Sequence, residues 1–405
     1  MESLNIKSWQ IDKDIKKIFN LLDKKNEETR FIGGCVRDLI IKKKSNYDID
    51  LATTILPSLV LKILKKKKIK VITSGITHGT VIAISNRKKI EITTLRKDIK
   101  TDGRHAVVRF TKDWIIDSHR RDLTINALSC DFKGKLYDYH NGLKDLKDGN
   151  IKFIGDSEER IKEDYLRMLR FFRFYGTYGK KKISKHEIKI FKKLSSNLKK
   201  LSSERVYSEF KKILLSNNLY EVLRLMKETK LLKYIIFENN DLKRIKNLEK
   251  ISQNLYLTDF TTILAILIKE KNMLKIFNNL NLSNDEKKKT KKLIVIQKRF
   301  NFKNIESNII KYIYEHGHEL AKNLLIYDFV KSPRESKIKK YLKIFSFIKK
   351  YKLPKFPITG KDIIKKGIKS GPVVGKILRS LEEWWFDNKA KPSRDECLKK
   401  LNDFC

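Results

Sequence analysis

The sequence is poor in residues that cross-link or anchor a chain. Its four cysteines are scattered through 405 residues with no CxxC pair and no zinc-ligand spacing. This pattern favours a reducing compartment and argues against a structural metal. The first residues lack the apolar core of a secretory signal, and the longest apolar runs, such as 261–268, are too short to span a membrane. We therefore expect a soluble, cytoplasmic protein that is not a membrane protein.

Acidic residues are also scarce, at 48 against 92 lysines and arginines, which gives a formal net charge of +44. One explanation is a compositional bias toward lysine and isoleucine. The other is a polyanionic partner, most commonly nucleic acid. The charge runs through segments with ordered patterns instead of a tail, and this favours nucleic acid.

Arginine is the rarer of the two basic residues, with 19 arginines against 73 lysines, yet ten of the arginines lie between Arg87 and Arg173. A guanidinium offers a planar fork of donors for phosphates and base edges, which a lysine ammonium cannot copy. Residues 87–173 are therefore predicted to contribute to the ligand-reading region.

Strand-like and helical patterns divide the chain. Helical periodicity over 10–25 and a helix near Val36 accompany six short strand-like runs, at 30–32, 47–52, 70–72, 79–84, 89–94 and 136–137. This mixture predicts an α/β or α+β domain. From Glu158 to about 350 the pattern is amphipathic helix, with breaks near 178–182, 216–218, 239–241 and 332–333. At 353–376, proline and glycine bracket two predicted short helices.

Asp48 and Asp50 are the first candidates for chemistry. They alternate with apolar residues in a strand-like run, so both carboxylates should point to the same face. Such a pair could hold a divalent cation through oxygen ligands, or it could be an exposed strand face or turn. Glu91 lies between Ile90 and Ile92 and is either a third metal-site carboxylate or an ordinary solvent-facing residue.

Gly33 and Gly34 precede Arg37 by one helical turn. Paired glycines let a backbone approach a phosphate, and a guanidinium nearby would add charge. A plain strand-to-helix turn is the alternative.

Residues 119–128 (HRRDLTINAL) place Arg120, Arg121 and Asp122 before an apolar run that we expect to be a helix. The group suits triphosphate and ribose contacts, and Thr124 and Asn126 within the apolar run favour that function. The alternative is a helix N-terminus with a favourable Asp and surface arginines.

In residues 163–173, a continuous helix would bring Asp164, Arg167 and Arg170 onto one face at i, i+3 spacing. They could form intrahelical ion pairs. They could also read a nucleobase, the carboxylate accepting from an exocyclic amine and a guanidinium donating to ring acceptors. Cytosine and adenine both carry that amine.

Together these segments resemble the class II tRNA nucleotidyltransferase / poly(A) polymerase family. The family's GGxVRD…DxD motif matches Gly33–Asp38 and Asp48–Asp50, its RRDxTINAL motif matches Arg120–Leu128, and its EDxxR motif matches Glu163–Arg167. A connecting motif resembles 138–146, and a later helix motif resembles Ser203–Arg205 with Glu209–Phe210. The matches run in the family's order from 31 to about 214.

The resemblance implies an α+β fold: a nucleotidyltransferase-type mixed β-sheet head with helices, followed by an all-α neck, body and tail. The corresponding domains are 1–150, 151–220, 221–330 and 331–405. It also implies Mg²⁺ bound by Asp48 and Asp50, and CTP or ATP read by Asp164 and Arg167. Further nucleotide contacts are expected from Gly33, Gly34, Arg37, Arg120, Arg121, Asp122, Asn126 and Arg170, with Glu91 as a catalytic candidate.

The implied activity is template-independent addition of CCA to tRNA 3′ ends. The tRNA would be held at its acceptor and elbow regions by shape and backbone, with no obligate protein partner. The segments 73–80 and 359–378 resemble the CCA-adding branch, and the Arg-rich segment typical of bacterial poly(A) polymerases is absent. Poly(A) synthesis and CC- or A-adding specialists stay open, as does a non-catalytic RNA-binding protein. Residues 95–110 resemble the family's mobile loop, in which Arg96, Asp102 and Arg104 are candidates.

Overall fold

The computed structural model describes residues 3–24, 26–42, 49–86, 88–101, 106–237, 242–255, 259–298, 305–331, 333 and 338–404. The chain forms two compact units, Met1–Phe237 and Glu238–Cys405. The first contains every described strand and the second is helical. Asp48, Asp102 and Arg104 lie outside the described residues.

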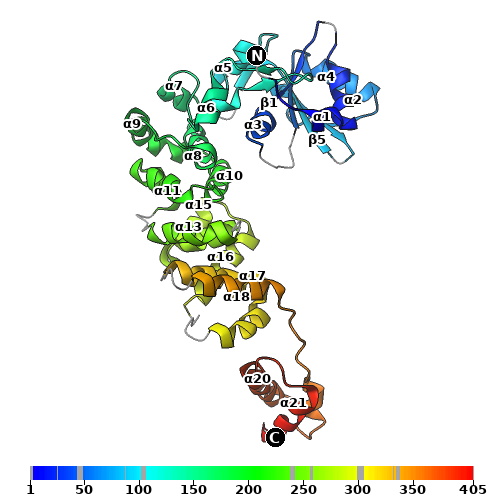
Figure 1. Ribbon diagram of the computed structural model, residues 1–405, viewed down its shortest axis with the longest axis vertical. Helices are drawn as coiled ribbons and strands as arrows, with labels where there is room; N and C mark the ends of the chain where they lie inside the picture. Colours follow the sequence, from blue (N-terminus) through cyan, green and yellow to red (C-terminus); the bar gives the residue numbers. More distant parts are fainter. Residues whose placement is uncertain are drawn as a thin grey trace. The chain divides into compact units, whose positions relative to one another are not determined.

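A mixed sheet opens the first unit, at the blue and cyan end of the chain in Figure 1. It has seven strands in the order β3-β4-β5-β2-β1-β8-β9. Only β2 and β5 pair in parallel among its described strands; the other neighbours are antiparallel. Each of the six predicted strand segments overlaps a strand, which confirms the mixed-sheet head. The strands are β1 (Thr29–Ile32), β2 (Ile49–Thr53), β3 (Lys70–Ile72), β4 (Thr80–Ser85), β5 (Lys88–Thr94), β8 (Ser129–Cys130) and β9 (Leu136–Tyr137).

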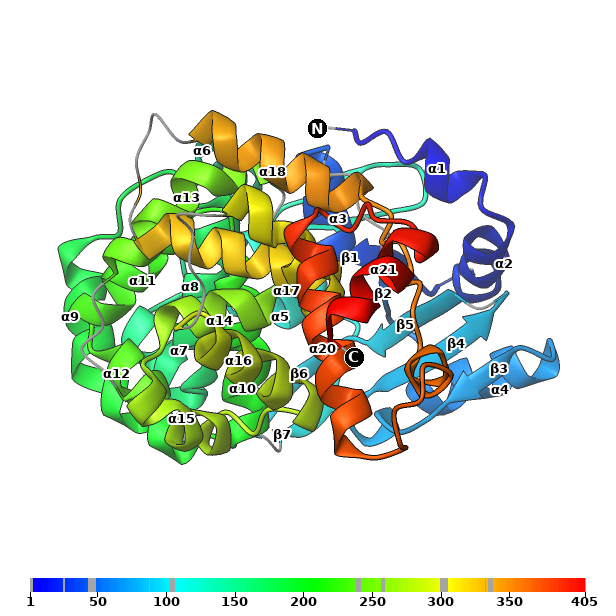
Figure 2. The same ribbon diagram turned by 90° about the horizontal axis from the view of Figure 1, so that it is seen from below.

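The sheet is stabilised on its apolar side by helices and aromatic rings. Phe31 on β1 is fully buried, and its ring lies 4.5 Å from that of Trp9 and 5.1 Å from that of Phe19. Helix α2 (Lys13–Leu22), whose apolar residues confirm the predicted periodicity, contacts α4 (Pro57–Lys66), which in turn lies against β3 and β4 (Figure 2). These contacts leave the other face of β2 and β5 available for polar side chains.

Residues 96–110 contain a hairpin that the strand patterns missed. Strands β6 (Arg96–Thr101) and β7 (Ala106–Phe110) pair antiparallel in a separate two-stranded sheet. The segment predicted as a loop is thus largely strand. Charged residues on β6 hid the period-2 signal, because both faces of a two-stranded ribbon can carry polar side chains.

The helices that follow stack on one another. Phe171 and Phe172 on α8 are buried, and α8 contacts both α10 and α11. The predicted breaks at 178–182 and 216–218 fall between helices, as expected. The described helices of the first unit are completed by α1 (Lys7–Gln10), α3 (Gly34–Ile40), α5 (Trp114–His119), α6 (Gly142–Asp148), α7 (Ser157–Glu163), α8 (Leu166–Tyr178), α9 (Lys185–Leu194), α10 (Ser203–Leu214), α11 (Leu219–Glu228) and α12 (Leu231–Ile236).

Two predicted helices were wrong in detail. Residues 120–128 do not enter an α-helix: Leu123 is extended and bridges to Phe153, and only a 3-10 turn, η2 (Thr124–Asn126), follows. Residues 163–173 are not one helix either. Asp164 is extended, with φ −154° and ψ 108°, and separates α7 from α8. In both places, hydrogen bonds from side chains and from distant parts of the same chain replace the helical ones. The pattern of residues within one segment cannot reveal such bonds.

The second unit is built around the apolar helix α14, all of whose residues are buried. The glycine Gly317 interrupts α17 with φ 80° and ψ 163°, a break that the sequence pattern missed. Of the two short helices expected near 353–376, α19 is short as predicted. Helix α20 is longer than predicted. The described helices are α13 (Lys243–Leu255), α14 (Phe260–Leu267), α15 (Met273–Asn279), α16 (Asn284–Ile296), α17 (Ile305–Lys331), α18 (Ile338–Lys350), α19 (Gly360–Ile364), α20 (Pro372–Asp387) and α21 (Arg394–Leu401).

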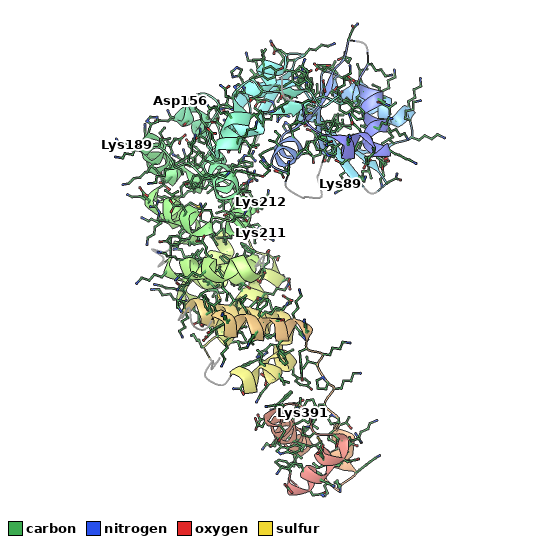
Figure 3. The ribbon with its side chains drawn as sticks, viewed as in Figure 1. Lys89, Asp156, Lys189, Lys211, Lys212 and Lys391 are labelled. Atoms are coloured by element: carbon green, nitrogen blue, oxygen red, sulfur yellow. The ribbon has the colours of Figure 1, made fainter. Side chains whose placement is uncertain are left out.

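Lysine side chains project from the surfaces of both units, as Lys89, Lys189 and Lys391 illustrate (Figure 3). Within the described residues, none of the helices has both the length and the apolar character needed to cross a membrane.

Candidate active site

Two carboxylates project from adjacent parallel strands. Asp50 on β2 and Glu91 on β5 are register partners, so their side chains share one face of the sheet. Their neighbours Ile49, Leu51 and Ile90 are buried on the opposite side. Asp50 and Glu91 both line the same cleft, whose volume is about 630 Å³. Carboxylate oxygens are the donors that hard divalent cations prefer, and Asp48 precedes Asp50 by two residues outside the described range.

The glycine pair at the start of α3 lies beside two guanidiniums, and a Cβ at either position would meet them at ordinary van der Waals distance. Gly33 has φ +67°, and a Cβ there would lie 3.9 Å from Nη1 of Arg121. A Cβ on Gly34 would lie 3.6 Å from Nη2 of Arg37. The left-handed φ of Gly33 favours glycine on backbone grounds alone. Both glycines line the cleft, so the turn and the ligand explanations of this pair are compatible.

Arg37 is buried in a polar and aromatic pocket. Its Nη1 donates to Oδ1 of Asn126 at 2.6 Å, and its Nε and Nη2 donate to Oδ1 of Asp38 at 3.2 and 3.1 Å. The rings of Phe174 and Tyr178, both on α8, lie 4.9 and 4.7 Å from its Cζ. The Tyr178 hydroxyl donates to the same Asp38 oxygen at 2.7 Å. Helix α3 of the head is thereby joined to α8.

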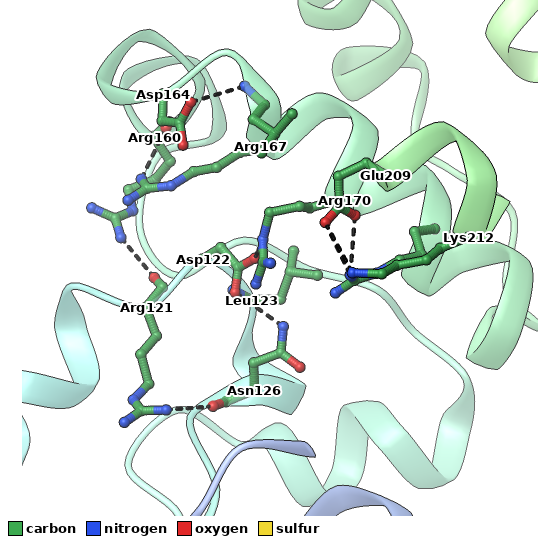
Figure 4. Close-up of polar contacts among 12 residues, drawn as sticks. Arg121, Asp122, Leu123, Asn126, Arg160, Asp164, Arg167, Arg170, Glu209 and Lys212 are labelled. Carbon is green, nitrogen blue, oxygen red and sulfur yellow. Dashed lines mark hydrogen bonds and ion pairs between the residues drawn. The ribbon is translucent and has the colours of Figure 1, made fainter. Parts of the chain in front are cut away.

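Asp122 links the 3-10 turn to α8 (Figure 4). Its Oδ2 accepts from Nε of Arg170 at 2.6 Å, and its Oδ1 accepts from Nδ2 of Asn126 at 3.0 Å. Burial alone would raise the pKa of this carboxyl, but the Arg170 guanidinium and the hydrogen bonds hold it well below its ordinary value. Asp122 is therefore ionised at neutral pH. Its oxygens orient Arg170 and Asn126, a role that the sequence patterns did not assign to it.

Arg120 and Arg121 share a buried carboxylate, Asp117 on α5. Nε of Arg120 and Nη2 of Arg121 donate to Asp117 at 2.9 and 3.2 Å. Nη1 of Arg121 also donates to the carbonyl oxygen of Asn126 at 3.2 Å. Arg160 donates to the carbonyl oxygen of Arg121 at 2.6 Å, as Figure 4 shows. Asp117 thus holds the side chains of Arg120 and Arg121, and Arg160 holds the backbone of Arg121.

The base-reading candidates lie at the junction of α7 and α8. Asp164 accepts from the backbone N–H of Leu166 at 3.1 Å and from Nη2 of Arg205, on α10, at 2.7 Å. Nη1 of Arg167 donates to the carbonyl oxygen of Arg160 at 2.9 Å and also pairs with Glu163. The predicted intrahelical pair between Asp164 and Arg167 or Arg170 is wrong, because Asp164 is not helical. The two candidate side chains nevertheless line one cleft.

All predicted site residues that the structure describes meet in this cleft: Gly33, Gly34, Arg37, Asp50, Glu91, Arg120, Arg121, Asp122, Asn126, Asp164, Arg167 and Arg170. They come from β2, β5, the start of α3, the 119–126 segment, the junction of α7 and α8, and α8 itself. Positions 33 and 170 are far apart in sequence, so only the fold brings them together.

Comparisons with known proteins agree with this geometry. Residues 29–152 match the model of the poly A polymerase head domain, and residues 182–241 match the probable RNA and SrmB-binding site of polymerase A. Human CCA tRNA nucleotidyltransferase 1, mitochondrial, is 35% identical over 402 residues, covering 95% of this chain and 88% of that protein. The chain belongs to the CCA tRNA nucleotidyltransferase family.

A bacterial family member gives the same result. The CCA-adding enzyme of Ligilactobacillus salivarius is 33% identical over 390 residues, with 92% of each chain covered. Among solved structures, the CCA-adding enzyme of Bacillus stearothermophilus in complex with CTP superposes with a TM-score of 0.74 at 23% identity, covering 96% of this chain and 95% of that one. At that identity the likeness establishes the shared nucleotidyltransferase fold.

The cleft of this CCA tRNA nucleotidyltransferase family member also contains residues that the sequence patterns left without a role. Arg96, Arg173 and Arg205 line it, together with Thr80, Thr93 and Phe174. Arg173 donates to the buried Glu209 at 3.1 Å. Two signals could have found them: Arg173 follows Arg170 by one helical turn, and Arg205 belongs to the helix motif at 203–210. Asp117 gave no such signal, because it lies outside every motif.

Proposed function

We propose that this protein adds CCA to the 3′ ends of tRNA, using CTP and ATP and releasing pyrophosphate. One observation carries the proposal. A single cleft presents two strand-borne carboxylates, Asp50 and Glu91, to eight arginines: Arg37, Arg96, Arg120, Arg121, Arg167, Arg170, Arg173 and Arg205. Guanidiniums gathered in one cleft suit a triphosphate, and carboxylates suit the cation that accompanies it.

In the reaction, the tRNA 3′-hydroxyl attacks the α-phosphorus, the new P–O bond forms and pyrophosphate leaves. Asp50, Asp48 and Glu91 would hold Mg²⁺, which when bound neutralises charge on the transferring phosphate and polarises it. Arg37, Arg120 and Arg121 would bind the triphosphate oxygens and so orient the α-phosphorus toward the hydroxyl. Positioning and charge stabilisation therefore account for most of the catalytic contribution of the chain.

Nucleotide choice would depend on Asp164 and Arg167. A carboxylate accepts from the exocyclic amine that cytosine and adenine share, and a guanidinium donates to their ring acceptors. Arg205 holds Asp164 at 2.7 Å and would fix the direction of that acceptor. Uracil and guanine lack the matching donor and acceptor pattern, which is the physical basis of their rejection.

The tRNA would bind to basic surfaces by shape and backbone, at its acceptor and elbow regions. We keep four domains in this proposal: the catalytic head at 1–150, the neck at 151–220, the body at 221–330 and the tail at 331–405. Lys211 and Lys212 on α10 are examples of the lysines at this surface (Figure 3), where Lys211 donates to the Tyr207 hydroxyl and Lys212 pairs with Glu209. We expect no obligate protein partner.

We also propose a cytoplasmic location, which rests on the scattered cysteines. The human relative carries "mitochondrial" in its name, and the bacterial one names no compartment. Both compartments are reducing. Fractionation of the source cells with an antibody to this chain would decide between them.

The decisive test is incubation with labelled CTP, ATP and Mg²⁺ on tRNA lacking its 3′ end. Three added nucleotides, read as C, C and A by sequencing the product, are the expected result. Two added cytidines would indicate a CC-adding specialist, and one adenosine an A-adding specialist. A long adenosine ladder, on tRNA and on a generic RNA alike, would indicate a poly(A) polymerase. No incorporation would contradict the enzyme assignment.

A further inference from the structure

Asp117 is a buried carboxylate beneath three cleft arginines. Its side chain is 3% exposed and accepts hydrogen bonds from Nε of Arg120 at 2.9 Å and Nη2 of Arg121 at 3.2 Å. Its Oδ1 also accepts from the backbone N–H of Arg96, the first residue of β6, at 3.1 Å. All three arginines line the cleft, whereas Asp117 is not among its described lining residues. Asp117 therefore acts on the cleft only through other residues.

The charges of this group explain why the carboxylate can be buried. An unpaired buried carboxylate is costly, and two guanidiniums compensate it here. Burial alone would raise the pKa of Asp117, but Arg120 and Arg121 lower it below its ordinary value, so the group stays ionised at neutral pH. Two positive side chains against one negative leave one net positive charge for the cleft. The pairing also restricts the rotamers of two long side chains before any ligand arrives.

We propose that Asp117 is a positioning residue for the triphosphate of the incoming nucleotide. It holds the Arg120 and Arg121 guanidiniums toward the cleft and ties them to the start of the β6–β7 hairpin. The inference rests on the proposed function, because it takes the cleft to be the nucleotide site. Pyrophosphate is the simplest probe, since it carries the phosphate groups without base, ribose or tRNA.

The competing explanation is that Asp117 merely supports α5. The helix offers a matched control, because its N-cap is a different aspartate. Oδ1 of Asp113 accepts from the backbone N–H groups of Ile115 and Ile116 at 2.7 and 3.2 Å. Asp113 is exposed and does not line the cleft. Asp113→Ala therefore weakens the same helix without altering the arginine pairs.

The experiment measures binding of pyrophosphate with Mg²⁺ to the full-length protein by calorimetry, and KM and kcat for CTP on tRNA. We expect Asp117→Asn to weaken pyrophosphate binding by about tenfold or more, because it removes a charge that orients two donors. The KM for CTP should rise by more than kcat falls. Asp113→Ala should lower the melting temperature and leave pyrophosphate affinity unchanged.

Unchanged pyrophosphate affinity in Asp117→Asn would overturn the proposal, and so would equal weakening in Asp113→Ala. If Asp117→Asn fails to fold by circular dichroism, Asp117→Glu carries the test. It keeps the charge but displaces both arginines by one methylene, so a partial loss of affinity is expected, and wild-type affinity would count against Asp117. A wild type that binds pyrophosphate yet adds nothing to tRNA would refute the proposed function and leave this test readable.

Discussion

The cleft and the second unit differ in their basic residues: arginine lines the cleft, and lysine predominates in the second unit. Eight of the 19 arginines line the cleft, and its described lining residues include no lysine. The unit at 238–405 has five arginines and 33 lysines. Cleft arginines pair with buried or half-buried carboxylates, as Arg170 does with Asp122, whereas Lys289–Asp285 and similar pairs are exposed and weak. Arginine is used where geometry decides the outcome, and lysine where charge alone suffices.

The largest effect is expected from removing the carboxylate of Asp50, which lines the same cleft as the eight arginines. Asp50→Ala should reduce incorporation of both C and A by more than about 100-fold, since losing even an outer-shell partner of a metal costs about 10- to 100-fold. Labelled-nucleotide incorporation measures this, and filter binding of tRNA is the control, which should change little. Activity close to that of the wild-type protein would contradict the metal-site assignment.

Arg167→Ala tests the geometric use of arginine directly. Discrimination of CTP and ATP against UTP and GTP should fall by about 10- to 100-fold, the value of one specific base contact. The matched control is Arg224→Ala on α11, an exposed arginine paired with Glu221 and Glu228 outside the cleft. Competition assays with mixed nucleotides supply the measurement. Equal selectivity in both variants would remove Arg167 from base reading.

Two conservative substitutions test whether arginine and lysine have different roles in the cleft and in the second unit. Arg121→Lys should raise the KM for CTP by about tenfold, because Nη1 and Nη2 of Arg121 bond two different partners and an ammonium cannot reach both. Lys365→Arg, at an exposed position after α19, should leave KM and tRNA affinity unchanged. If the two exchanges have equal effects, the division between arginine and lysine carries no functional meaning.

The smallest effect concerns the joint between α3 and α8. Tyr178→Phe keeps the ring beside Arg37 but removes the hydroxyl bond to Asp38, which should lower the free energy of unfolding by about 1–2 kcal/mol. Denaturant unfolding at neutral pH measures this difference.

The same bond has a defined pH dependence. Burial, and then the bond to Asp38, raise the pKa of Tyr178 from 10.0 to about 12. A raised folded-state pKa means that the stabilisation is complete below pH 10 and is lost as the pH rises toward 12. The stability difference between wild type and Tyr178→Phe should therefore stay constant up to about pH 10 and shrink above it. A difference that persists unchanged at pH 12 would contradict this account of the hydroxyl.

The sequence predicted which residues line the cleft better than it predicted the backbone around them. Motif residues such as Arg37 and Arg170 could be named because their types suit phosphate chemistry and the family order is specific. The extended conformation of Asp164 was not predicted, because its long-range partner Arg205, 41 positions away, gives no local signal. Asp117 was not predicted for a similar reason. The sequence alone does not show that this acidic helix residue is buried and paired with arginines. Strands β6, β7 and β8 were missed; charge hides the periodicity of β6, and β8 is only two residues long.

The parallel pairing of β2 and β5 makes part of this gene unusually intolerant of length changes. Asp50 and Glu91 face the cleft together only because they are register partners. One residue inserted into or deleted from β5 ahead of Glu91 would turn that carboxylate to the buried face and bring an isoleucine out. An extra residue in an exposed turn between helices shifts no such alternation. Comparing natural length variants should therefore show insertions collecting between helices and avoiding the β5 strand.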